Sequence, residues 1–261
     1  MKLGVIGLGA IGTELLRILA AADADVEVTG ALVRDPAKRR DRQVAVFADP
    51  VAFLASGPDL VVECASQAAF SACVPMMLAA GRDVIAGSVG ALADEQVHAA
   101  VDAAARAGCC ALHIPAGALS GIDALAAAKL VGIDTVTYTR SAPPSTWAGH
   151  EAVRGVDLLA LDAPYLVFAG TAREAARRFP KNANVAAAIA LAGIGFERTR
   201  VRIHADPAVD ANVHTIDAEG PFGRLHTELS ATRISPASTS SRIVAASLAR
   251  SVLCRTWRIA I

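Results

Sequence analysis

The N-terminal stretch "KLGVIGLGAIGTELLRILAA" restricts the fold of this chain more than any other feature. The run "KLGVIGL" is short and apolar, which is typical of a buried parallel strand, and "TELLRILAA" continues with helical periodicity. Between them Gly7, Gly9 and Gly12 have the spacing G-x-G-x-x-G. These glycines permit a tight turn, close approach of the backbone to a pyrophosphate, and close packing of the helix. The order strand, glycine turn, helix therefore predicts a dinucleotide-binding domain.

The alternation of strands and helices continues beyond the glycine turn. The runs "VEVTGALV", "DLVVECAS", "DVIAGS" and "CCALHIP" have the pattern of strands, and helical segments separate them. Such alternation predicts a doubly wound parallel sheet, in which ligands bind at the carboxyl ends of the strands. The residues that we expect to contact the dinucleotide in this domain are Gly7, Gly9, Ala10, Ile11, Gly12, Ala65 and Ser66.

Two charged residues follow the second strand and bear on the choice between NAD and NADP. An acid at this place accepts hydrogen bonds from the ribose hydroxyls of NAD, whereas an arginine pairs with the extra phosphate of NADP. Here Arg34 comes first and Asp35 follows. Both are candidate cofactor contacts, so the cofactor is NAD or NADP. The alternative is that Arg34 is only a solvated loop charge.

The second half of the chain has a different pattern. The runs "ERTRVRIHADP", "ANVHTIDAEG" and "GRLHTELS" alternate polar and apolar residues, which predicts an antiparallel sheet with one face toward solvent or a cleft. The expected fold class is α/β, with an N-terminal Rossmann-type doubly wound parallel sheet and a C-terminal α+β substrate and dimerisation domain. We place the first domain at 1–115 and the second at 116–237, with a last helix in 238–261 that packs back on the first.

Charge and cysteine usage exclude several other classes of protein. Among the 261 residues, 25 basic and 25 acidic side chains balance, so no basic field would attract nucleic acid or an anionic membrane. No apolar run reaches the roughly 18 residues of a membrane-spanning helix. The five cysteines form no CxxC pair and have no histidine at metal spacing, so we expect free thiols, no metal and a cytoplasmic protein.

Motifs along nearly the whole chain resemble one family, the NAD(P)-dependent L-aspartate dehydrogenases. The resemblance rests on "GLGAIG", "VVECAS", "DVIAGSVGAL", "IPAGALSGID", "RFPKNANVAAAIALAG", "NVHTIDAEGPFG" and "SPASTSSRIVAASL". It implies oxidation of L-aspartate to iminoaspartate, which hydrolyses to oxaloacetate and ammonia or feeds NAD biosynthesis, and it implies a homodimer. Two residues depart from the family pattern, because Ala116 stands where the family tends to have serine and Ala142 where it tends to have lysine.

The resemblance also implies roles for three residues. His214 matches the catalytic histidine of the family, and Ala118, through its backbone amide, and Asn184 match its contacts to the cofactor. A neutral imidazole suits the reaction because it can take a proton and return it. From the local pattern alone, a half-buried sheet residue is the favoured interpretation of His214. For Asn184 the N-cap of a helix is an alternative that is compatible with its cofactor role.

A dicarboxylate substrate also needs cations, because a guanidinium or ammonium group gives a carboxylate both energy and orientation. The candidates for substrate binding are Arg140, Lys181 and Arg233. Asp217, three residues after His214 in the same strand, points to the other face and is not assigned as its partner.

Two other functions share the features of the first half. One is a reductase of the dihydrodipicolinate-reductase or homoserine-dehydrogenase type, and the other is a dinucleotide sensor without catalytic activity. Replacement of His214 distinguishes the enzyme from the sensor, since only the enzyme loses turnover.

Overall fold

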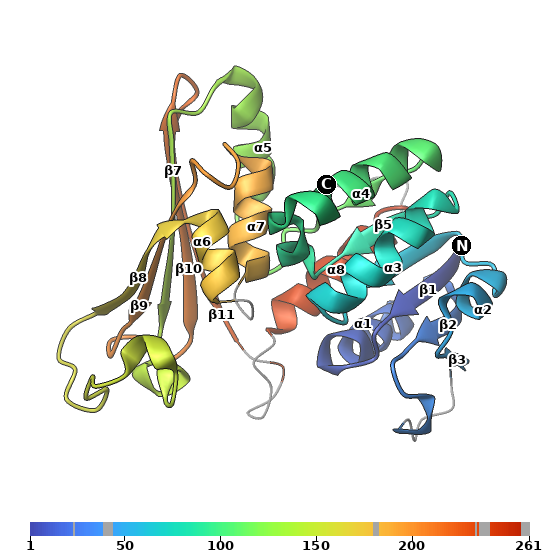
Figure 1. Cartoon of the computed structure of the whole chain (residues 1–261), viewed down its shortest axis with the longest axis horizontal. Helices are drawn as coiled ribbons and strands as arrows, with labels where there is room; N and C mark the ends of the chain where they lie inside the picture. Colours follow the sequence, from blue (N-terminus) through green and yellow to red (C-terminus); the bar gives the residue numbers. More distant parts are fainter. Residues whose placement is uncertain (23, 39–43, 180–182, 233, 235–240, 257–261) are drawn as a thin grey trace. The chain divides into compact units, whose positions relative to one another are not determined.

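The computed structural model describes residues 1–22, 24–38, 44–179, 183–232, 234 and 241–256. The chain divides into two compact units (Figure 1). Unit 1 comprises Met1–Gly117 together with Arg233–Ile261, and unit 2 comprises Ala118–Thr232.

Unit 1 contains a six-stranded sheet with the order β3-β2-β1-β4-β5-β6, in which every pair of neighbours is parallel. This is the strand order of a doubly wound dinucleotide-binding fold, so the predicted fold of the first domain is confirmed. The strands are β1 (Lys2–Ile6), β2 (Glu27–Leu32), β3 (Val46–Phe47), β4 (Leu60–Glu63), β5 (Asp83–Ala86) and β6 (Leu112–His113).

Helices cover this sheet, and the side chain of the preceding residue caps three of them, α2, α3 and α4. Ser66 caps α3 by accepting the N–H of Ala69, and Asp94 caps α4 by accepting the N–H groups of Gln96 and Val97. The helices are α1 (Ala10–Ala21), α2 (Pro50–Ala55), α3 (Gln67–Ala79), α4 (Glu95–Ala107) and α8 (Arg242–Leu253), with short 3₁₀ turns η1 (Pro36–Lys38) and η2 (Val89–Ala93).

The C-terminal helix α8 belongs to the core of unit 1. Its residues Leu248 and Val252 are fully buried in one cluster with Leu15 of α1 and Val62 of β4. Burial of such side chains is worth about 1.5–3 kcal/mol each, so the end of the chain stabilises the dinucleotide-binding unit.

Unit 2 contains a five-stranded sheet with the order β11-β10-β7-β9-β8. The sheet is mixed, because β7 and β9 run parallel while the other neighbours run antiparallel. The expectation of an antiparallel sheet is therefore wrong for this one pair. The elements are α5 (Ile122–Val131), β7 (Thr135–Ala142), η3 (Pro144–Trp147), η4 (Glu151–Val153), β8 (Tyr165–Thr171), α6 (Ala172–Arg178), α7 (Ala183–Ala192), β9 (Arg200–Ala205), β10 (Asn212–Gly220) and β11 (Gly223–Ala231).

The two faces of this sheet differ in burial. Helices α5, α6 and α7 lie on one side of it (Figure 1). Along β7, residues alternate between buried and half-buried from Val136 to Ala142, and β10 alternates in the same way. The buried set includes two polar side chains, Arg140 and His214, which are 5% and 7% exposed. Polar groups at such positions need partners, and those partners define the candidate site.

Candidate functional site

The glycine turn after β1 has three positions with different requirements. Gly7 has a φ of 97°, and a Cβ added there would lie 2.6 Å from the Cβ of Ala65. A Cβ on Gly12 would lie 2.2 Å from the carbonyl oxygen of Gly7. A Cβ on Gly9 would meet nothing within 4 Å. The fold therefore requires glycine at Gly7 and Gly12, whereas the open space at Gly9 is available to a ligand.

The N-terminus of α1 is suited to an anion. Gly9 is its N-cap and supplies no side-chain hydrogen bond, and the first turn contains no acidic residue. The N–H groups of Ala10, Ile11 and Gly12 have no intrahelical acceptor at this position of a helix, and the helix dipole favours negative charge there. A pyrophosphate fits this turn, because the missing side chain leaves room for close approach and the amides point to it.

Glu63, at the end of β4, links the loops that follow β4 and β5, and the sequence analysis did not identify it. Its Oε1 accepts hydrogen bonds from the N–H of Ala65 (2.8 Å), the N–H of Ser66 (3.2 Å) and the hydroxyl of Ser88 (2.9 Å). Its Oε2 accepts the N–H of Ser88 (3.0 Å). Glu63 is fully buried, and this burial raises its pKa. The sequence feature that could have identified Glu63 is a single acidic residue within the apolar strand "LVVE".

Two predicted cofactor residues lie where β2 ends. Arg34 is exposed, and Asp35 is half-buried. Oδ1 of Asp35 accepts the N–H of Ala37 at 3.1 Å, which opens the 3₁₀ turn η1. Both residues thus follow β2 at the carboxyl edge of the parallel sheet.

In unit 2, His214 of β10 is held by a tyrosine that the sequence analysis did not identify. Nδ1 of His214 lies 2.7 Å from the hydroxyl oxygen of Tyr138 on β7, and both side chains are buried. Their rings are nearly parallel, with 10° between the planes and 6.0 Å between the centroids. Among the described residues, none forms a hydrogen bond with Nε2 of His214. That nitrogen is consequently the one through which His214 can act on a substrate.

Arg140 lies directly opposite His214 in the antiparallel pair of β7 and β10. One of its terminal nitrogens donates to Oδ1 of Asn212 at 2.8 Å, and its guanidinium lies 5.2 Å from the centroid of the Trp147 ring. Burial, with a smaller contribution from the charge of Arg140, lowers the pKa of His214 to about 4. His214 is therefore a neutral imidazole at neutral pH, and a fixed cation lies beside it.

Of the remaining predicted cofactor and substrate residues, the structure describes Ala118 and Asn184. Ala118 is buried, and among the described residues none accepts a hydrogen bond from its N–H, so this amide can donate to a ligand. Asn184 is half-buried and is the second residue of α7, so it is not the N-cap of that helix. Lys181 and Arg233 lie outside the described residues.

Of the two departures from the family pattern, Ala116 is half-buried and Ala142 is fully buried in β7.

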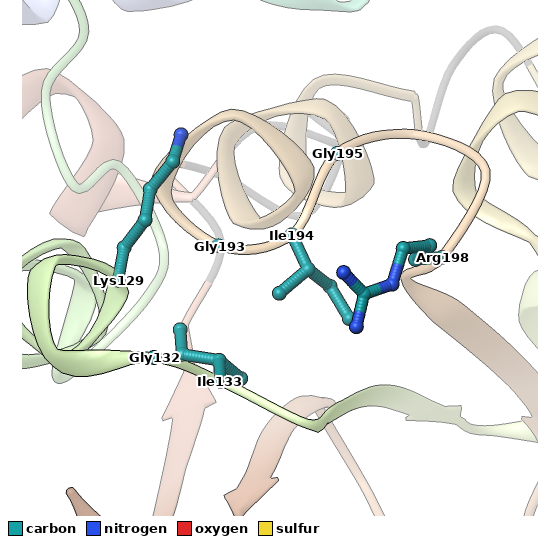
Figure 2. Close-up of a pocket in the computed structure, with 7 residues that line it drawn as sticks. All are labelled: Lys129, Gly132, Ile133, Gly193, Ile194, Gly195 and Arg198. Carbon is teal, nitrogen blue, oxygen red and sulfur yellow. The ribbon is translucent and has the colours of Figure 1, made fainter. Parts of the chain in front are cut away.

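A cavity of about 480 Å³ is lined by residues that precede β7 and by residues that follow α7 (Figure 2). Its lining includes Lys129 and Arg198, which lie on either side of Gly193 and Ile194. The Lys129 ammonium donates to the carbonyl oxygen of Leu191 (3.2 Å), and Arg198 donates to that of Asp134 (3.4 Å). These cations satisfy one carbonyl group in the last turn of α7 and one in the loop before β7, which is a structural role.

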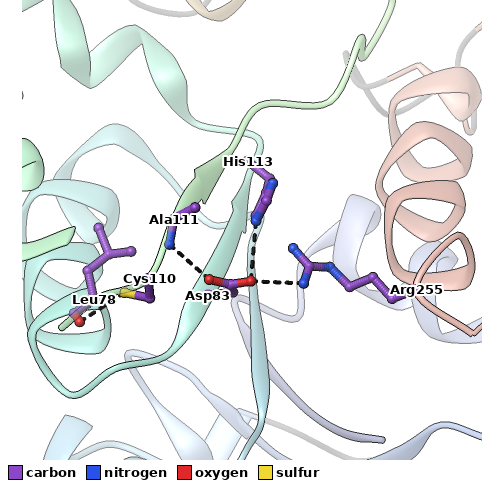
Figure 3. A network of polar contacts seen from close by, with 6 residues as sticks. All are labelled: Leu78, Asp83, Cys110, Ala111, His113 and Arg255. Atoms are coloured by element: carbon purple, nitrogen blue, oxygen red, sulfur yellow. Dashed lines mark hydrogen bonds and ion pairs between the residues drawn. The ribbon is translucent and has the colours of Figure 1, made fainter. Parts of the chain in front are cut away.

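A network of polar contacts in unit 1 joins the sheet to the residues after α8 (Figure 3). Oδ1 of Asp83 accepts the N–H of Ala111 at 2.8 Å, while its Oδ2 accepts from Arg255 at 2.8 Å and lies 3.3 Å from Nε2 of His113. Asp83 is the first residue of β5, so the network lies at the opposite edge of the sheet from the glycine turn. It anchors the C-terminal helix.

Within the described ranges, no group of three or more His, Cys, Asp and Glu side chains is placed to hold a metal ion. None of the helices described is both long and apolar enough to cross a membrane.

Comparison with known proteins identifies both parts of the chain. A family model described as the NAD-binding domain of homoserine dehydrogenase matches residues 7–115, and a model described as the C-terminal part of aspartate dehydrogenase matches residues 123–254. The first match identifies unit 1 as an NAD-binding domain. A homoserine dehydrogenase from a hyperthermophilic archaeon, solved with NADPH, has a TM-score of 0.60 over 97% of this chain and 96% of its own at 12% identity, which shows a shared fold alone.

Full-length relatives have a more specific similarity. The L-aspartate dehydrogenase 1 of Bordetella bronchiseptica is 46% identical over 97% of this chain and 95% of its own length. The L-aspartate dehydrogenase of Methanosarcina mazei is 40% identical over 88% and 87% of the two chains. The crystal structure of aspartate dehydrogenase from Thermotoga maritima has a TM-score of 0.81 and 25% identity, covering 100% of this chain and 99% of its own. The chain therefore belongs to the L-aspartate dehydrogenase family.

Proposed function

We propose that this protein catalyses the NAD(P)-dependent oxidation of L-aspartate to iminoaspartate, which water hydrolyses to oxaloacetate and ammonia. The observation that carries the proposal is the pair formed by a buried, neutral His214 and a buried Arg140 on one face of the sheet, in a member of this family. A base beside a fixed cation suits a substrate that has both an amino group and carboxylates.

The dinucleotide is received by unit 1. The amides of Gly9, Ala10, Ile11 and Gly12 bind the pyrophosphate, and Gly7 makes the turn that presents them. When bound, the dinucleotide supplies one chemistry, the acceptance of a hydride at C4 of its nicotinamide. Ala65, Ser66, Ala118 and Asn184 complete the cofactor contacts. The Glu63 hydrogen bonds support this assignment, because they fix the amides of two of these residues.

We further propose that both cofactors are used. Arg34 pairs with the 2′-phosphate of NADP, and Asp35 accepts hydrogen bonds from the ribose hydroxyls of NAD. The support is their place directly after β2, where the ribose of a dinucleotide lies in folds of this order.

Arg140 binds a substrate carboxylate, and Nε2 of His214 takes the proton that the amino nitrogen loses. The Cα hydrogen leaves with its electron pair as hydride, so the Cα–N single bond becomes the C=N bond of the imine. His214 then releases its proton as water adds to that bond. Lys181 and Arg233 are proposed for the second carboxylate.

The reaction is tested by incubating the protein with NAD⁺ or NADP⁺ and a panel of L-amino acids, with reduction followed by absorbance. L-Aspartate deuterated at Cα should transfer its deuterium to the reduced dinucleotide, as measured by mass spectrometry. Reduction confined to L-aspartate with transfer of the label is the expected result. Absence of reduction with every amino acid, despite binding of the dinucleotide, would contradict the proposal and favour the sensor.

We also propose that the protein is a homodimer in which the open faces of the two unit 2 sheets pack against each other. The open face of unit 2 carries Arg200 and Arg202 on β9, and Asp217 and Glu228 on β10 and β11. Because a two-fold axis places the basic side of one copy on the acidic side of the other, this face is complementary to itself. Sedimentation should give a dimer in the wild type and a monomer in Arg202→Glu; a monomeric wild type would contradict the proposal.

Two cellular assignments belong with this function. The five cysteines are free thiols, which supports a reducing compartment such as the cytoplasm. Iminoaspartate is short-lived in water, so a partner enzyme that consumes it would connect the reaction to NAD biosynthesis. Deletion of the gene in a strain without another source of iminoaspartate should impose a requirement for a pyridine precursor.

A further inference from the structure

We propose that Tyr138 is a positioning residue that sets the tautomer of His214. Its hydroxyl oxygen accepts a hydrogen bond from Nδ1–H and so keeps the lone pair of Nε2 available to the substrate. This inference rests on the proposed function, since it assigns the base of that reaction its reactive nitrogen.

The geometry of the sheet builds this contact. His214 on β10 pairs with Arg140 on β7, and the next buried pair is Ile216 with Tyr138. Tyr138 and His214 are therefore diagonal neighbours on one face, a relationship that an aromatic side chain can span. Two central strands hold both residues, so the 2.7 Å separation of their polar atoms is fixed by backbone pairing.

The burial of Tyr138 indicates that its hydroxyl group has a specific role. Tyr138 is 2% exposed, and a phenylalanine would fill almost the same space without a polar atom. The hydroxyl of Tyr138 lies within hydrogen-bond distance of Nδ1 of His214, where a hydroxyl can donate or accept, and acceptance from Nδ1–H is the arrangement that leaves the lone pair of Nε2 to the substrate. Burial also raises the pKa of Tyr138 well above its ordinary value, so the group stays a neutral phenol. It can therefore orient the imidazole without competing for the proton.

The proton-bearing state of His214 depends on this oxygen. Removal of a proton from the substrate at Nε2 turns His214 into an imidazolium, in which both ring nitrogens are donors. Arg140, opposite on β7, opposes that charge, while β11 presents the apolar Leu229 on the other side. The Tyr138 oxygen then accepts the Nδ1–H of a charged donor, a stronger bond than one between neutral groups. Tyr138 thus stabilises the intermediate state more than the resting one.

The tautomer can be measured directly in the wild-type protein. Nitrogen-15 NMR of labelled histidine distinguishes a protonated Nδ1 from a protonated Nε2. With His214→Ala used to assign the signal, we expect Nδ1 to carry the hydrogen near neutral pH. A resting His214 with the hydrogen on Nε2 would overturn the inference, whatever reaction the protein catalyses.

The variant Tyr138→Phe tests the same inference through turnover. We expect kcat for L-aspartate oxidation to fall about 10- to 100-fold, less than the roughly 10²–10⁴-fold that general acid–base catalysis contributes as a whole, because His214 itself remains. The Kd of the dinucleotide should not change, and the acidic limb of the kcat profile should move to lower pH. Tyr165→Phe, at the other tyrosine of the chain, is exposed on β8 and is the matched control, with wild-type behaviour expected.

The outcomes separate this inference from the proposed function. If the wild type oxidises L-aspartate, His214→Ala is inactive and Tyr138→Phe keeps the wild-type kcat and pH profile, the role of Tyr138 is overturned and the function stands. If the wild type oxidises no amino acid, the function fails, and the nitrogen-15 signals still decide the tautomer.

Discussion

His214 and Arg140 lie directly opposite each other in the antiparallel pair of β10 and β7, and both are buried. The arrangement places a permanent cation next to a titratable base inside the sheet domain. Burial and this cation lower the pKa of His214 to about 4, so the imidazole is neutral over the whole range near neutral pH. The pair thus places an unprotonated imidazole beside a permanent positive charge.

The first prediction concerns stability against pH. Because the pKa of His214 is about 4 in the folded protein and near 6.5 in the unfolded chain, the unfolded state binds the proton first. The contribution of His214 to the free energy of unfolding is complete above about pH 6.5. It is lost as the pH falls to about 4, and the loss is about 3 kcal/mol. Urea unfolding at several pH values measures it, and His214→Gln should have a smaller dependence. If the free energy of unfolding depended on pH equally in the wild type and in His214→Gln, the lowered pKa of His214 would be refuted.

The second prediction concerns Arg140. Arg140→Gln removes the cation that we propose for a substrate carboxylate, so we expect KM for L-aspartate to rise about 10- to 100-fold, from the worth of a hydrogen bond to a charged group. The pKa of His214 should rise toward its ordinary value, because the like charge is gone. Arg177→Gln, exposed on α6, is the control. An unchanged KM in Arg140→Gln would exclude Arg140 from substrate binding.

The third prediction compares two glycines of the same turn. Gly9→Ala has open space for its Cβ, so the free energy of unfolding should change by less than about 1 kcal/mol. The Kd of the dinucleotide should rise about tenfold or more, because the methyl group occupies the approach of the pyrophosphate. Gly12→Ala, whose Cβ meets a backbone oxygen, should lose about 1–3 kcal/mol of stability as well. Calorimetry and fluorescence titration measure both quantities, and tight binding by Gly9→Ala would be evidence against a pyrophosphate site.

The fourth prediction concerns Glu63, whose two oxygens accept four hydrogen bonds. Glu63→Gln replaces one acceptor by a donor that faces another donor, so about 1–3 kcal/mol of stability should be lost. Since the loops after β4 and β5 are joined through this carboxylate, the Kd of the dinucleotide should rise as well. Glu27→Gln, exposed on β2, is the control. Wild-type affinity in Glu63→Gln would show that these loops do not depend on the network.

The fifth prediction concerns cofactor choice. Arg34→Gln should raise the Kd of NADP⁺ about tenfold or more and leave that of NAD⁺ nearly unchanged, since only NADP carries the 2′-phosphate. Isothermal titration with each dinucleotide measures the difference. Equal effects on both would identify Arg34 as a general surface charge.

The sequence predicted what depends on local pattern. The glycine spacing between a strand and a helix predicted the turn, and the alternation of strands and helices predicted the parallel sheet. The alternation in the second half indicated a sheet but not its pairing, because a strand with one buried face has the same pattern in parallel and antiparallel neighbours. The parallel pair β7 and β9 was therefore missed.

The partners of the candidate residues depend on strand register, which a single sequence does not contain. Tyr138 and Arg140 share a face because they are two residues apart, but only the pairing with β10 places them beside His214. Glu63 was visible as an acid in an apolar strand, yet its four donors come from two different loops. Both residues act through contacts that the fold creates.

The most direct test of the account is to measure turnover and dinucleotide binding on the same preparation of His214→Ala. Loss of nearly all L-aspartate oxidation, with the Kd of the dinucleotide close to wild type, is the predicted result. Full turnover in this variant would contradict the account, because the buried neutral imidazole would then have no part in the reaction.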